Sequence, residues 1–385
     1  MAMQRTKGFS LALTAGAAAA LLLLTGCSTS TSSATNSPSA NTDGVSTAAG
    51  LVDQYSQVVE SFTPTDAVPG ASTALKGKKV MYIPAVAAVP YFATSFKATQ
   101  AAFSAVGMKA QLCDAQANPS SLSSCFTQVT TQGYAAVVID SIDPSIAIEG
   151  FKAVAATGIP VIVLNVPVPA KSPTNVSGFG VDSVLQQRLS SAAIISDSKG
   201  TASVVGVRVI DHDGTKAWWD YGAAATYKEL CPNCKLSVVE TKTTDLQNLP
   251  AKVSAALLAS PDAMYLQPEL GPETIPTLQG GTDAGRTDLK ATVASATLSD
   301  LQQLASGTGL KWAVTHDLVR LQWLSADMVI RSLSKVAFDA TKYVINSRIF
   351  TPENVKGLDV TQAGWDDSNW FGGNDYQTTL KGLWK

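Results

Sequence analysis

Short apolar runs and longer amphipathic stretches alternate along the chain from Lys79 onward. The short runs are rich in β-branched residues and predict buried strands, whereas the amphipathic stretches end near glycines and predict helices. In the first series the predicted strands are Val80–Pro84, Lys109–Cys113, Ala135–Asp140 and Pro160–Asn165, and the predicted helices are Ala93–Val106, Ser120–Gln132 and Ile146–Thr157. This order predicts a parallel sheet with helices on both faces.

A second series of the same kind follows Pro167–Asp182, a stretch with prolines and glycines but no helical pattern. Its predicted helices are Ser183–Ser198, Lys216–Leu230, Leu246–Ala259 and Val319–Ser334, and its predicted strands are Ala202–Ile210, Lys235–Thr241, Ala263–Leu266, Lys290–Val293 and Leu310–Thr315. The natural interpretation is two doubly wound α/β lobes, each with its own sheet, with Pro167–Asp182 as the first connection between them.

The first 26 residues have the order of an export signal. Basic residues precede an apolar run over residues 9–24, and Leu24-Thr25-Gly26-Cys27 matches the lipobox of bacterial lipoproteins. A transmembrane anchor is the alternative, because the run approaches the roughly 18 residues that a span needs. The lipobox favours cleavage before Cys27 and acylation of that cysteine.

Residues 28–50 contain mostly Ser, Thr, Asn, Ala and Gly. Such a segment buries too little apolar surface to offset its ordering entropy, so we expect a flexible tether. Residues 27–74 are therefore assigned as a lipidated cysteine and a tether with a short helix. No later run approaches a membrane span, so the lipid alone is expected to hold the protein on the outer face of the cell membrane.

Composition narrows the function further. With 385 residues and 45% hydrophobic side chains, the chain is long enough for two domains. Its 28 Lys and Arg against 30 Asp and Glu leave no basic excess for a nucleic acid. His212 and His316 are the only histidines, which excludes a three-histidine site, and they lie too far apart for an H-E-x-x-H zinc helix.

Four cysteines beyond Cys27 fall into two local pairs, Cys113 with Cys125 and Cys231 with Cys234. In an exported chain such spacing favours structural disulfides over metal ligands or a redox centre. The C-x-x-C at Cys231 follows a predicted helix and precedes a strand, which is not the thioredoxin order. The spacing leaves the connectivity itself open.

Ligands of open parallel sheets bind beyond the carboxyl ends of the strands. Two facing lobes would bring those ends around one cleft, and no metal or other cofactor is expected there. The candidate ligand-binding residues at the strand ends are Tyr91, Phe92, Asp140, Asn165, Asp213, Trp218, Trp219, Glu269, Ser295 and His316. Only one of the two adjacent tryptophans can face the core. Asp211–Gly214 has some features of a calcium loop but lacks its other oxygen ligands, so a solvated turn is favoured.

Several motifs resemble the type I periplasmic binding proteins, the ribose/galactose-binding class. They are Val89-Pro90-Tyr91-Phe92, Asp114 with Asn118-Pro119, Gly133–Asp140, Gly158–Val163, Ser260–Ala263 and the tail Asp375-Tyr376…Leu383-Trp384. The resemblance covers roughly residues 75 to 385. It implies two parallel-sheet lobes joined by three crossovers, which close on a small solute by hinge motion.

The departures from this class bear on the ligand. Its sugar-gripping Asn before the aromatic pair and its Asp-Arg after the fourth strand are replaced by Val89 and by Asn165-Val166. Glu269, Ser295 and His316 stand at three further binding positions. Fewer bidentate donors argue against a common pentose or hexose. The expected ligand is a sugar-like compound, a polyol or another small polar solute, with an aromatic solute also open.

The resemblance assigns residues 75–175 plus about 317–350 to the N-terminal lobe, and residues 176–316 plus about 351–385 to the C-terminal lobe. It predicts a monomeric lipoprotein that delivers its solute to an ABC permease. A lipoprotein of the same fold that senses its ligand for a membrane receptor is the alternative. A lipid-anchored hydrolase is disfavoured, because no G-x-S-x-G, P-loop or G-x-G-x-x-G motif follows a strand.

Overall fold

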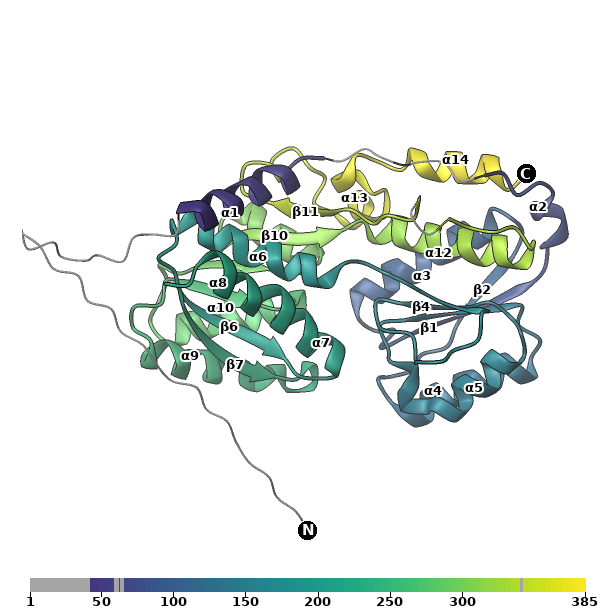
Figure 1. The fold of residues 1–385 in the computed structure, drawn as a ribbon, viewed down its shortest axis with the longest axis horizontal. Helices are drawn as coiled ribbons and strands as arrows, with labels where there is room; N and C mark the ends of the chain where they lie inside the picture. The colour runs from purple at the N-terminus through teal and green to yellow at the C-terminus, as the bar shows by residue number, and fades with distance from the viewer. Residues whose placement is uncertain (1–41, 59–61, 63–65, 340–341) are drawn as a thin grey trace, which may run out of the picture. The chain divides into compact units, whose positions relative to one another are not determined.

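The computed structural model describes residues 42–58, 62, 66–339 and 342–385. The predicted signal peptide, Cys27 and the tether up to residue 41 lie outside these residues. The described chain forms two sheets with helices packed on their faces (Figure 1). The predicted fold class, two parallel-sheet α/β lobes, is confirmed. In the part of the chain described here, no helix is long and apolar enough to span a bilayer.

The first sheet has five parallel strands in the order β2-β1-β3-β4-β5. They are β1 Lys79–Pro84, β2 Lys109–Leu112, β3 Ala136–Asp140, β4 Val161–Leu164 and β5 Val176–Phe179. Strand β5 lies inside the stretch predicted to be an irregular connection. Its sequence, VSGF, has a glycine and a serine and is only partly buried, so it lacks the apolar signal of a central strand.

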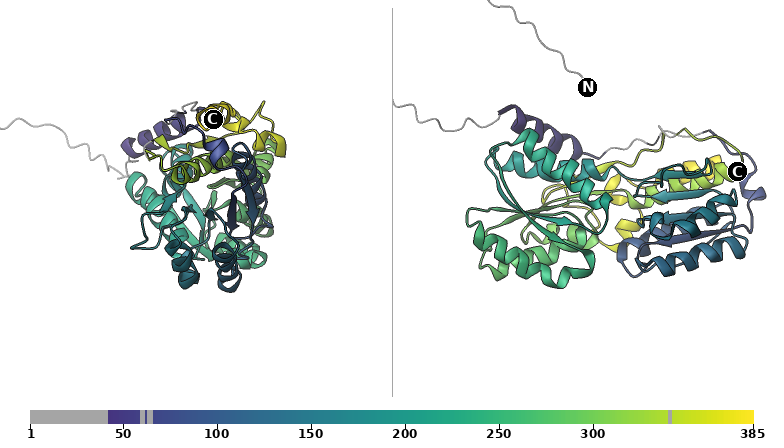
Figure 2. Two further views of the ribbon diagram at one scale, coloured as in Figure 1. Left: turned by 90° about the vertical axis from the view of Figure 1, so that its right-hand side faces the viewer. Right: turned by 60° about the horizontal axis from the view of Figure 1, so that its bottom comes forward.

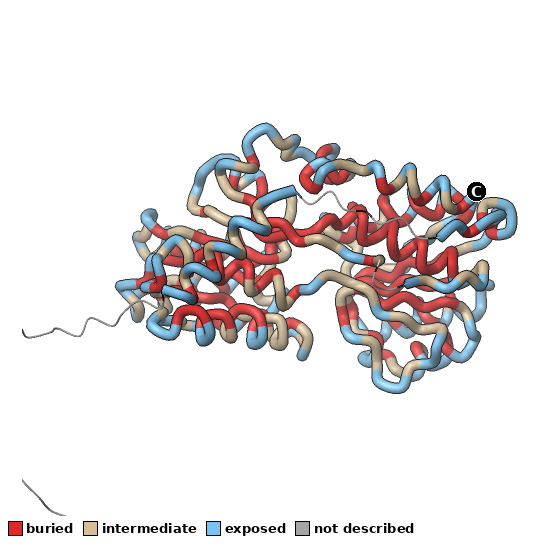
Figure 3. The backbone as a smooth tube through the Cα atoms, turned by 45° about the horizontal axis from the view of Figure 1, so that its top comes forward, coloured by how far each residue is buried: buried red, intermediate tan, exposed pale blue. Residues whose placement is uncertain are grey.

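Alternate residues of β1 face opposite layers of helices. Val80 and Tyr82 pack in one core with α3 (Pro90–Ser104) and α12 (Leu318–Leu333). Met81 and Ile83 pack in another with α4 (Pro119–Thr131) and α5 (Ile148–Ala156). Helix α12 is buried along nearly its whole length, so it belongs to the core of the first lobe although it follows the second lobe's strands in sequence (Figure 3).

The second sheet has six strands in the order β11-β10-β9-β8-β6-β7. They are β6 Ser203–Val209, β7 Lys235–Thr241, β8 Tyr265–Pro268, β9 Lys290–Val293, β10 Leu310–His316 and β11 Ser347–Phe350. All pair in parallel except β11, which runs antiparallel to β10 at the edge. The two sheets with their flanking helices are seen from a second direction in Figure 2.

The second lobe's helices also cover two faces. The core on one face includes residues of α6 (Ser183–Asp197) and α8 (Ala225–Leu230), and the core on the other includes residues of α9 (Leu249–Ala259) and α11 (Leu298–Ser306). The remaining helices are α2 Ala71–Ala74, α7 Asp213–Trp218, α10 Thr274–Asp283, α13 Gln362–Asp366 and α14 Asp375–Leu383.

The chain passes between the lobes between β5 and α6, between β10 and α12, between α12 and β11, and again between Phe371 and α14. Two later segments lie the other way round from the predicted domain assignment. Strand β11, assigned to the N-terminal lobe, belongs to the second sheet. Helix α14, assigned to the C-terminal lobe, packs in the core of the first lobe through Tyr376 and Leu380.

Buried tryptophans hold the C-terminal tail against both lobes. Trp365 and Trp370 are buried in the second lobe and stack at 5.7 Å between ring centroids. Trp384 is buried in the first lobe, where it stacks on Trp323 of α12 at 5.9 Å. The tail therefore adds core to both lobes.

Helix α1 (Thr42–Tyr55) shortens the predicted tether, which was expected to extend to residue 50. It packs along α6 and α8 of the second lobe, where Ala48 is fully buried. The sequence of α1 is polar and small, so its stability comes from packing against α6 rather than from a strong apolar stripe of its own.

Both predicted cysteine pairs form disulfides. Cys113–Cys125 joins the end of β2 to α4, and Cys231–Cys234 closes the turn between α8 and β7. One bridge lies in each lobe, and each closes a short loop.

Candidate functional site

The strand ends of the first lobe are organised around Asp140, the last residue of β3. Tyr82 Oη (2.7 Å) and Gln322 Nε2 (3.0 Å) donate to one of its carboxylate oxygens. Ser141 Oγ (2.9 Å) and Asn165 Nδ2 (3.0 Å) donate to the other. Burial raises the pKa of Asp140, while the four donors oppose that rise. Asp140 is fully buried and saturated, so in this structure it positions its neighbours and is not open to a ligand, contrary to its predicted role.

Asn165 is one of the side chains that Asp140 positions. Its backbone has φ of 62°, a left-handed conformation that Asn tolerates better than most residues. Its amide nitrogen also donates to Tyr91 Oη at 3.3 Å. Phe92 packs edge-on against Tyr91, with ring centroids 5.1 Å apart, and is itself largely buried. Tyr91 is thereby held at the start of α3 from two sides.

The second lobe meets Tyr91 through His316, the last residue of β10. The distance from His316 Nε2 to Tyr91 Oη is 3.4 Å, and Gln186 Nε2 lies 3.1 Å from His316 Nδ1. Burial lowers the pKa of His316 to about 4, so the ring is neutral at pH 7. Because the Gln186 amide donates to Nδ1, the proton lies on Nε2 and points at Tyr91 Oη.

This geometry leaves the Tyr91 hydroxyl with a free hydrogen. Its oxygen accepts from both Asn165 and His316, so its own O–H is directed elsewhere. Gln186 is fixed in turn, because Ser295 Oγ donates to its Oε1 at 2.9 Å and its amide also donates to Ser347 Oγ at 3.2 Å. A hydrogen-bonded chain thus runs from Asn165 to Ser295 across the two lobes.

The two adjacent tryptophans have different environments. Trp219 is 1% exposed, and its ring packs against Gly206 of β6, where an added Cβ would come within 2.4 Å of the ring. Trp218 is half-buried and packs edge-on against His212 at 5.8 Å. Residues Trp219–Ala224 form a π-helical turn between α7 and α8. Trp219 is therefore a core residue, contrary to its prediction as a ligand contact, and Trp218 is the tryptophan that remains available.

Glu269 and Asp213, two further predicted ligand-binding residues, lie outside the cluster around Tyr91. Glu269, which follows β8, is fully buried, and one of its oxygens accepts from the backbone N–H of Val209 at 2.6 Å. Burial raises its pKa well above the usual range. Asp213 is exposed at the start of α7 and pairs with Lys216 at 2.6 Å, which lowers its pKa. Neither residue belongs to the hydrogen-bonded chain around Tyr91.

The sequence did not single out Gln186 and Gln322, which hold the cluster from α6 and α12. Both are fully buried amides on helices that follow interlobe connections. Gln322 interrupts an apolar stretch of α12, whereas Gln186 lies among other buried polar residues of α6, so only Gln322 has a sequence signal. The lobes are also joined beside this cluster by an ion pair between Lys97 and Asp366, and by a hydrogen bond of 2.8 Å from Gln362 Nε2 to Thr94 Oγ1.

A hollow of about 370 Å³ lies at the opposite end of the first sheet, where the strands begin. Its lining residues Ala135, Gly158 and Asn175 precede strands β3, β4 and β5. It shares no residue with the cluster around Tyr91. Within the described chain, no group of three or more His, Cys, Asp or Glu side chains is arranged to hold a metal ion. The arrangement at Tyr91 is suited to binding through neutral hydrogen bonds and aromatic faces.

Residues 80–335 match the family described as periplasmic binding protein domain. The chain belongs to this family. A search of curated proteins found no relative by sequence.

Solved periplasmic binding proteins share the fold at low sequence identity. The 5-methylthioribose transporter solute-binding protein of Thermotoga lettingae has a TM-score of 0.69 at 16% identity, covering 81% of this chain and 98% of that one. An ABC transporter solute-binding protein of Mycobacterium smegmatis with bound glycerol has a TM-score of 0.64 at 18% identity, covering 74% and 98%. One of Actinobacillus succinogenes with bound D-allose has a TM-score of 0.65 at 14% identity, covering 72% and 99%.

Proposed function

We propose that this periplasmic binding protein is an extracytoplasmic lipoprotein that captures a small, uncharged polar solute between its lobes and delivers it to an ABC importer. A sugar-like compound or polyol is the favoured ligand class, and an aromatic solute is a second possibility. The observation that carries the proposal is the meeting of Tyr91, Asn165 and His316, which come from the strand ends of both lobes.

The hydrogen-bond donors and charges at this junction indicate which chemical groups the ligand carries. The Tyr91 O–H is free to donate, and the phenol ring and the half-buried Trp218 supply aromatic faces. His316 is neutral at pH 7, and Lys216, the cation nearest in sequence to Trp218, is already paired with Asp213. A ligand with hydroxyl oxygens and an apolar face fits this set better than a carboxylate or a phosphate ester, which requires a cationic partner.

The ligands of known structures with this fold support the same ligand class. Three of the neighbours are described with 5-methylthioribose, glycerol or D-allose, which are all uncharged polyhydroxy compounds. Lipid attachment rests on the lipobox ending at Cys27. Delivery to a permease rests on membership of the family.

Calorimetry of residues 28–385 against sugars, polyols, thiosugars, amino acids and aromatic acids tests the ligand class. We expect binding from one class of uncharged polyhydroxy compounds. Tyr91→Phe removes the free donor and is expected to weaken that binding about tenfold, the effect of one hydrogen bond. Tyr221→Phe is the matched control, because Tyr221 is 72% exposed on the π-helical turn. Tight binding of an anionic compound alone would contradict the proposal.

Uptake of the identified ligand by the native host separates delivery from sensing. Deletion of the protein is expected to abolish uptake of the labelled ligand. Unchanged uptake together with a lost transcriptional response would favour the sensing lipoprotein instead. Cys27→Ser is expected to release the protein from the membrane fraction, and it provides the test of lipid attachment.

A further inference from the structure

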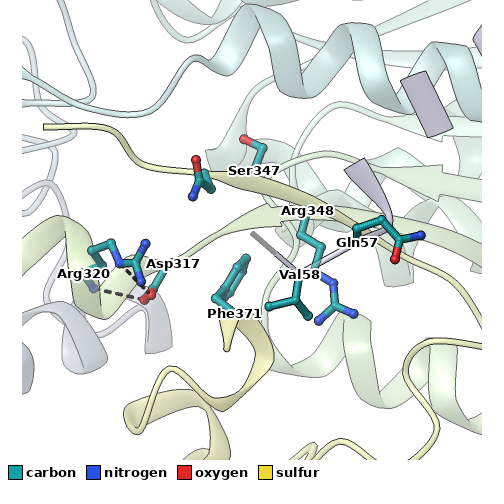
Figure 4. A pocket seen from close by; sticks show the side chains of 8 residues that line it. Gln57, Val58, Asp317, Arg320, Ser347, Arg348 and Phe371 are labelled. Atoms are coloured by element: carbon teal, nitrogen blue, oxygen red, sulfur yellow. Dashed lines mark hydrogen bonds and ion pairs between the residues drawn. The ribbon is translucent and has the colours of Figure 1, made fainter. Parts of the chain in front are cut away.

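A small pocket lies where segments that connect the lobes meet, and one of its lining residues is Asp317, which follows His316 in the sequence (Figure 4). Its volume is about 10 Å³. Arg320 and Asp317 lie to one side of Phe371 in the view of Figure 4, and Arg348 lies to the other. These residues come from the start of α12, from β11 and from the turn before α14, which are the segments that connect the lobes.

Arg320 is a buried cation without adequate partners. Its side chain is 6% exposed, and its Nε is buried without a hydrogen-bond partner among the residues that the structure describes. The closest carboxylate oxygen, Asp317 Oδ2, is 3.6 Å from Nε, beyond ordinary hydrogen-bond distance. The guanidinium also lies over the ring of Tyr376 at 4.7 Å. An arginine has five N–H donors, and a buried donor left without a partner is costly.

Arg348 adds a second positive charge to the same pocket. It is 7% exposed and donates to the backbone carbonyls of Ser56 and Trp370, and no carboxylate pairs with it among the described residues. Burial lowers its pKa, and an arginine remains charged after such a shift. With Asp317 ionised, the pocket is lined by two guanidinium groups and one carboxylate, so its lining carries a net charge of about +1.

We propose that this hinge pocket, defined by Arg320, Arg348, Asp317 and Phe371, binds a chloride ion. The volume matches about one water-sized particle, which selects a single-atom anion over sulfate or phosphate. The N-terminus of α12, a helix of 16 residues, adds its positive end to the two guanidinium groups. An anion here completes the donors of Arg320 and balances the buried charge.

Crystals of the wild-type protein grown or soaked in bromide test the site directly. We expect an anomalous peak in the pocket, in contact with the Arg320 guanidinium. A water molecule without anomalous signal at that position, with bromide on the surface only, would overturn the proposal.

Thermal unfolding in chloride and in gluconate, at one ionic strength, supplies a second readout. Chloride binds the folded state only, so it is expected to raise the midpoint by about 2 to 4 °C. Arg320→Gln is expected to abolish this difference. Arg188→Gln is the control, because Arg188 pairs with Glu229 on the surface and is expected to keep it. If Arg320→Gln does not fold, Arg348→Lys serves in its place. A wild-type midpoint that does not depend on the anion would refute the site.

A consequence for ligand binding rests on the proposed function. The pocket walls belong to the segments that bend when the lobes move, so chloride is expected to change solute affinity by a few fold. The bromide and unfolding experiments require no solute. Their failure would therefore remove the anion site and leave the solute receptor intact, and failure of the solute screen would leave the anion site standing.

Discussion

Asp140 and Glu269 occupy similar places in the two lobes and have opposite surroundings. Each follows or ends a central strand of its sheet, and each is fully buried. Asp140 receives four side-chain donors, whereas Glu269 receives one backbone N–H and leaves its other oxygen without a partner among the described residues. Burial alone therefore does not define the role of a strand-end carboxylate, because the number of donors decides whether the charged form is supported.

Asp140 and Glu269 also differ in whether they hold other side chains in place. In the first lobe the carboxylate fixes Asn165, which in turn fixes Tyr91. In the second lobe Glu269 is fully buried, and the side chains that reach the Tyr91 cluster are His316 and Gln186. The first lobe thus offers a preorganised surface around Tyr91, while the second contributes a few side chains near the hinge.

The largest expected effect is at Trp219, in the core of the second lobe. Trp219→Ala removes a ring packed directly on Gly206 and is expected to lower the free energy of unfolding by roughly 3 to 5 kcal/mol. Trp218→Ala is the matched control, with a small stability change and weaker solute binding. Urea unfolding and calorimetry measure both variants. Equal losses of stability would contradict the assignment of the two indoles.

A smaller loss is expected for Asp140→Asn. The amide group must face an N–H donor in either orientation, since Gln322 and Asn165 each donate to a different carboxylate oxygen. We expect a loss of about 3 kcal/mol and weaker solute binding through displacement of Tyr91. Unfolding in urea measures the first effect. A variant as stable as the wild type would show that the network is not under hydrogen-bond control.

Glu273 gives the second lobe a pH dependence. Burial raises its pKa from 4.5 to about 8, so the folded state holds a proton that the unfolded state releases. Its contribution to stability is fully present below pH 4.5 and declines as the pH rises toward 8. Glu273→Gln is expected to flatten this decline in unfolding curves between pH 5 and 8. An unchanged slope would assign the decline to other groups.

The smallest effect is expected at Glu269. Its raised pKa favours the protonated form, and Gln can keep the hydrogen bond from Val209. Glu269→Gln is therefore expected to change the free energy of unfolding by less than about 1 kcal/mol at pH 7. The contrast with Asp140→Asn tests the comparison most directly, because each substitution exchanges one carboxylate oxygen for an amide nitrogen.

The sequence was sufficient for features that local patterns control. Buried β-branched runs located most strands, and the short spacings indicated both disulfides. The parallel order of strands also predicted that residues as distant as Tyr91 and His316 would meet.

Other features depend on contacts that periodicity does not encode. The π-helical turn at Trp219 departs from α-helical spacing, so the pattern could not decide which indole faces the core. Asp140 is closed off by Gln322, a residue 182 positions away. Strand β11 and helix α14 lie in the opposite lobes from those predicted. Their places depend on tertiary contacts that their own sequences do not encode.

Helix α1 gives the protein an asymmetry at the membrane. It is packed onto the second lobe. About 15 residues separate it from Cys27, and a segment of that number of residues can span at most about 50 Å. With the proposed lipid at Cys27, the second lobe is attached directly to the membrane tether. The first lobe is attached only through the second lobe and would move relative to it. Each closing stroke would then move the Tyr91 surface relative to the bilayer while the His316 surface stays at a bounded height.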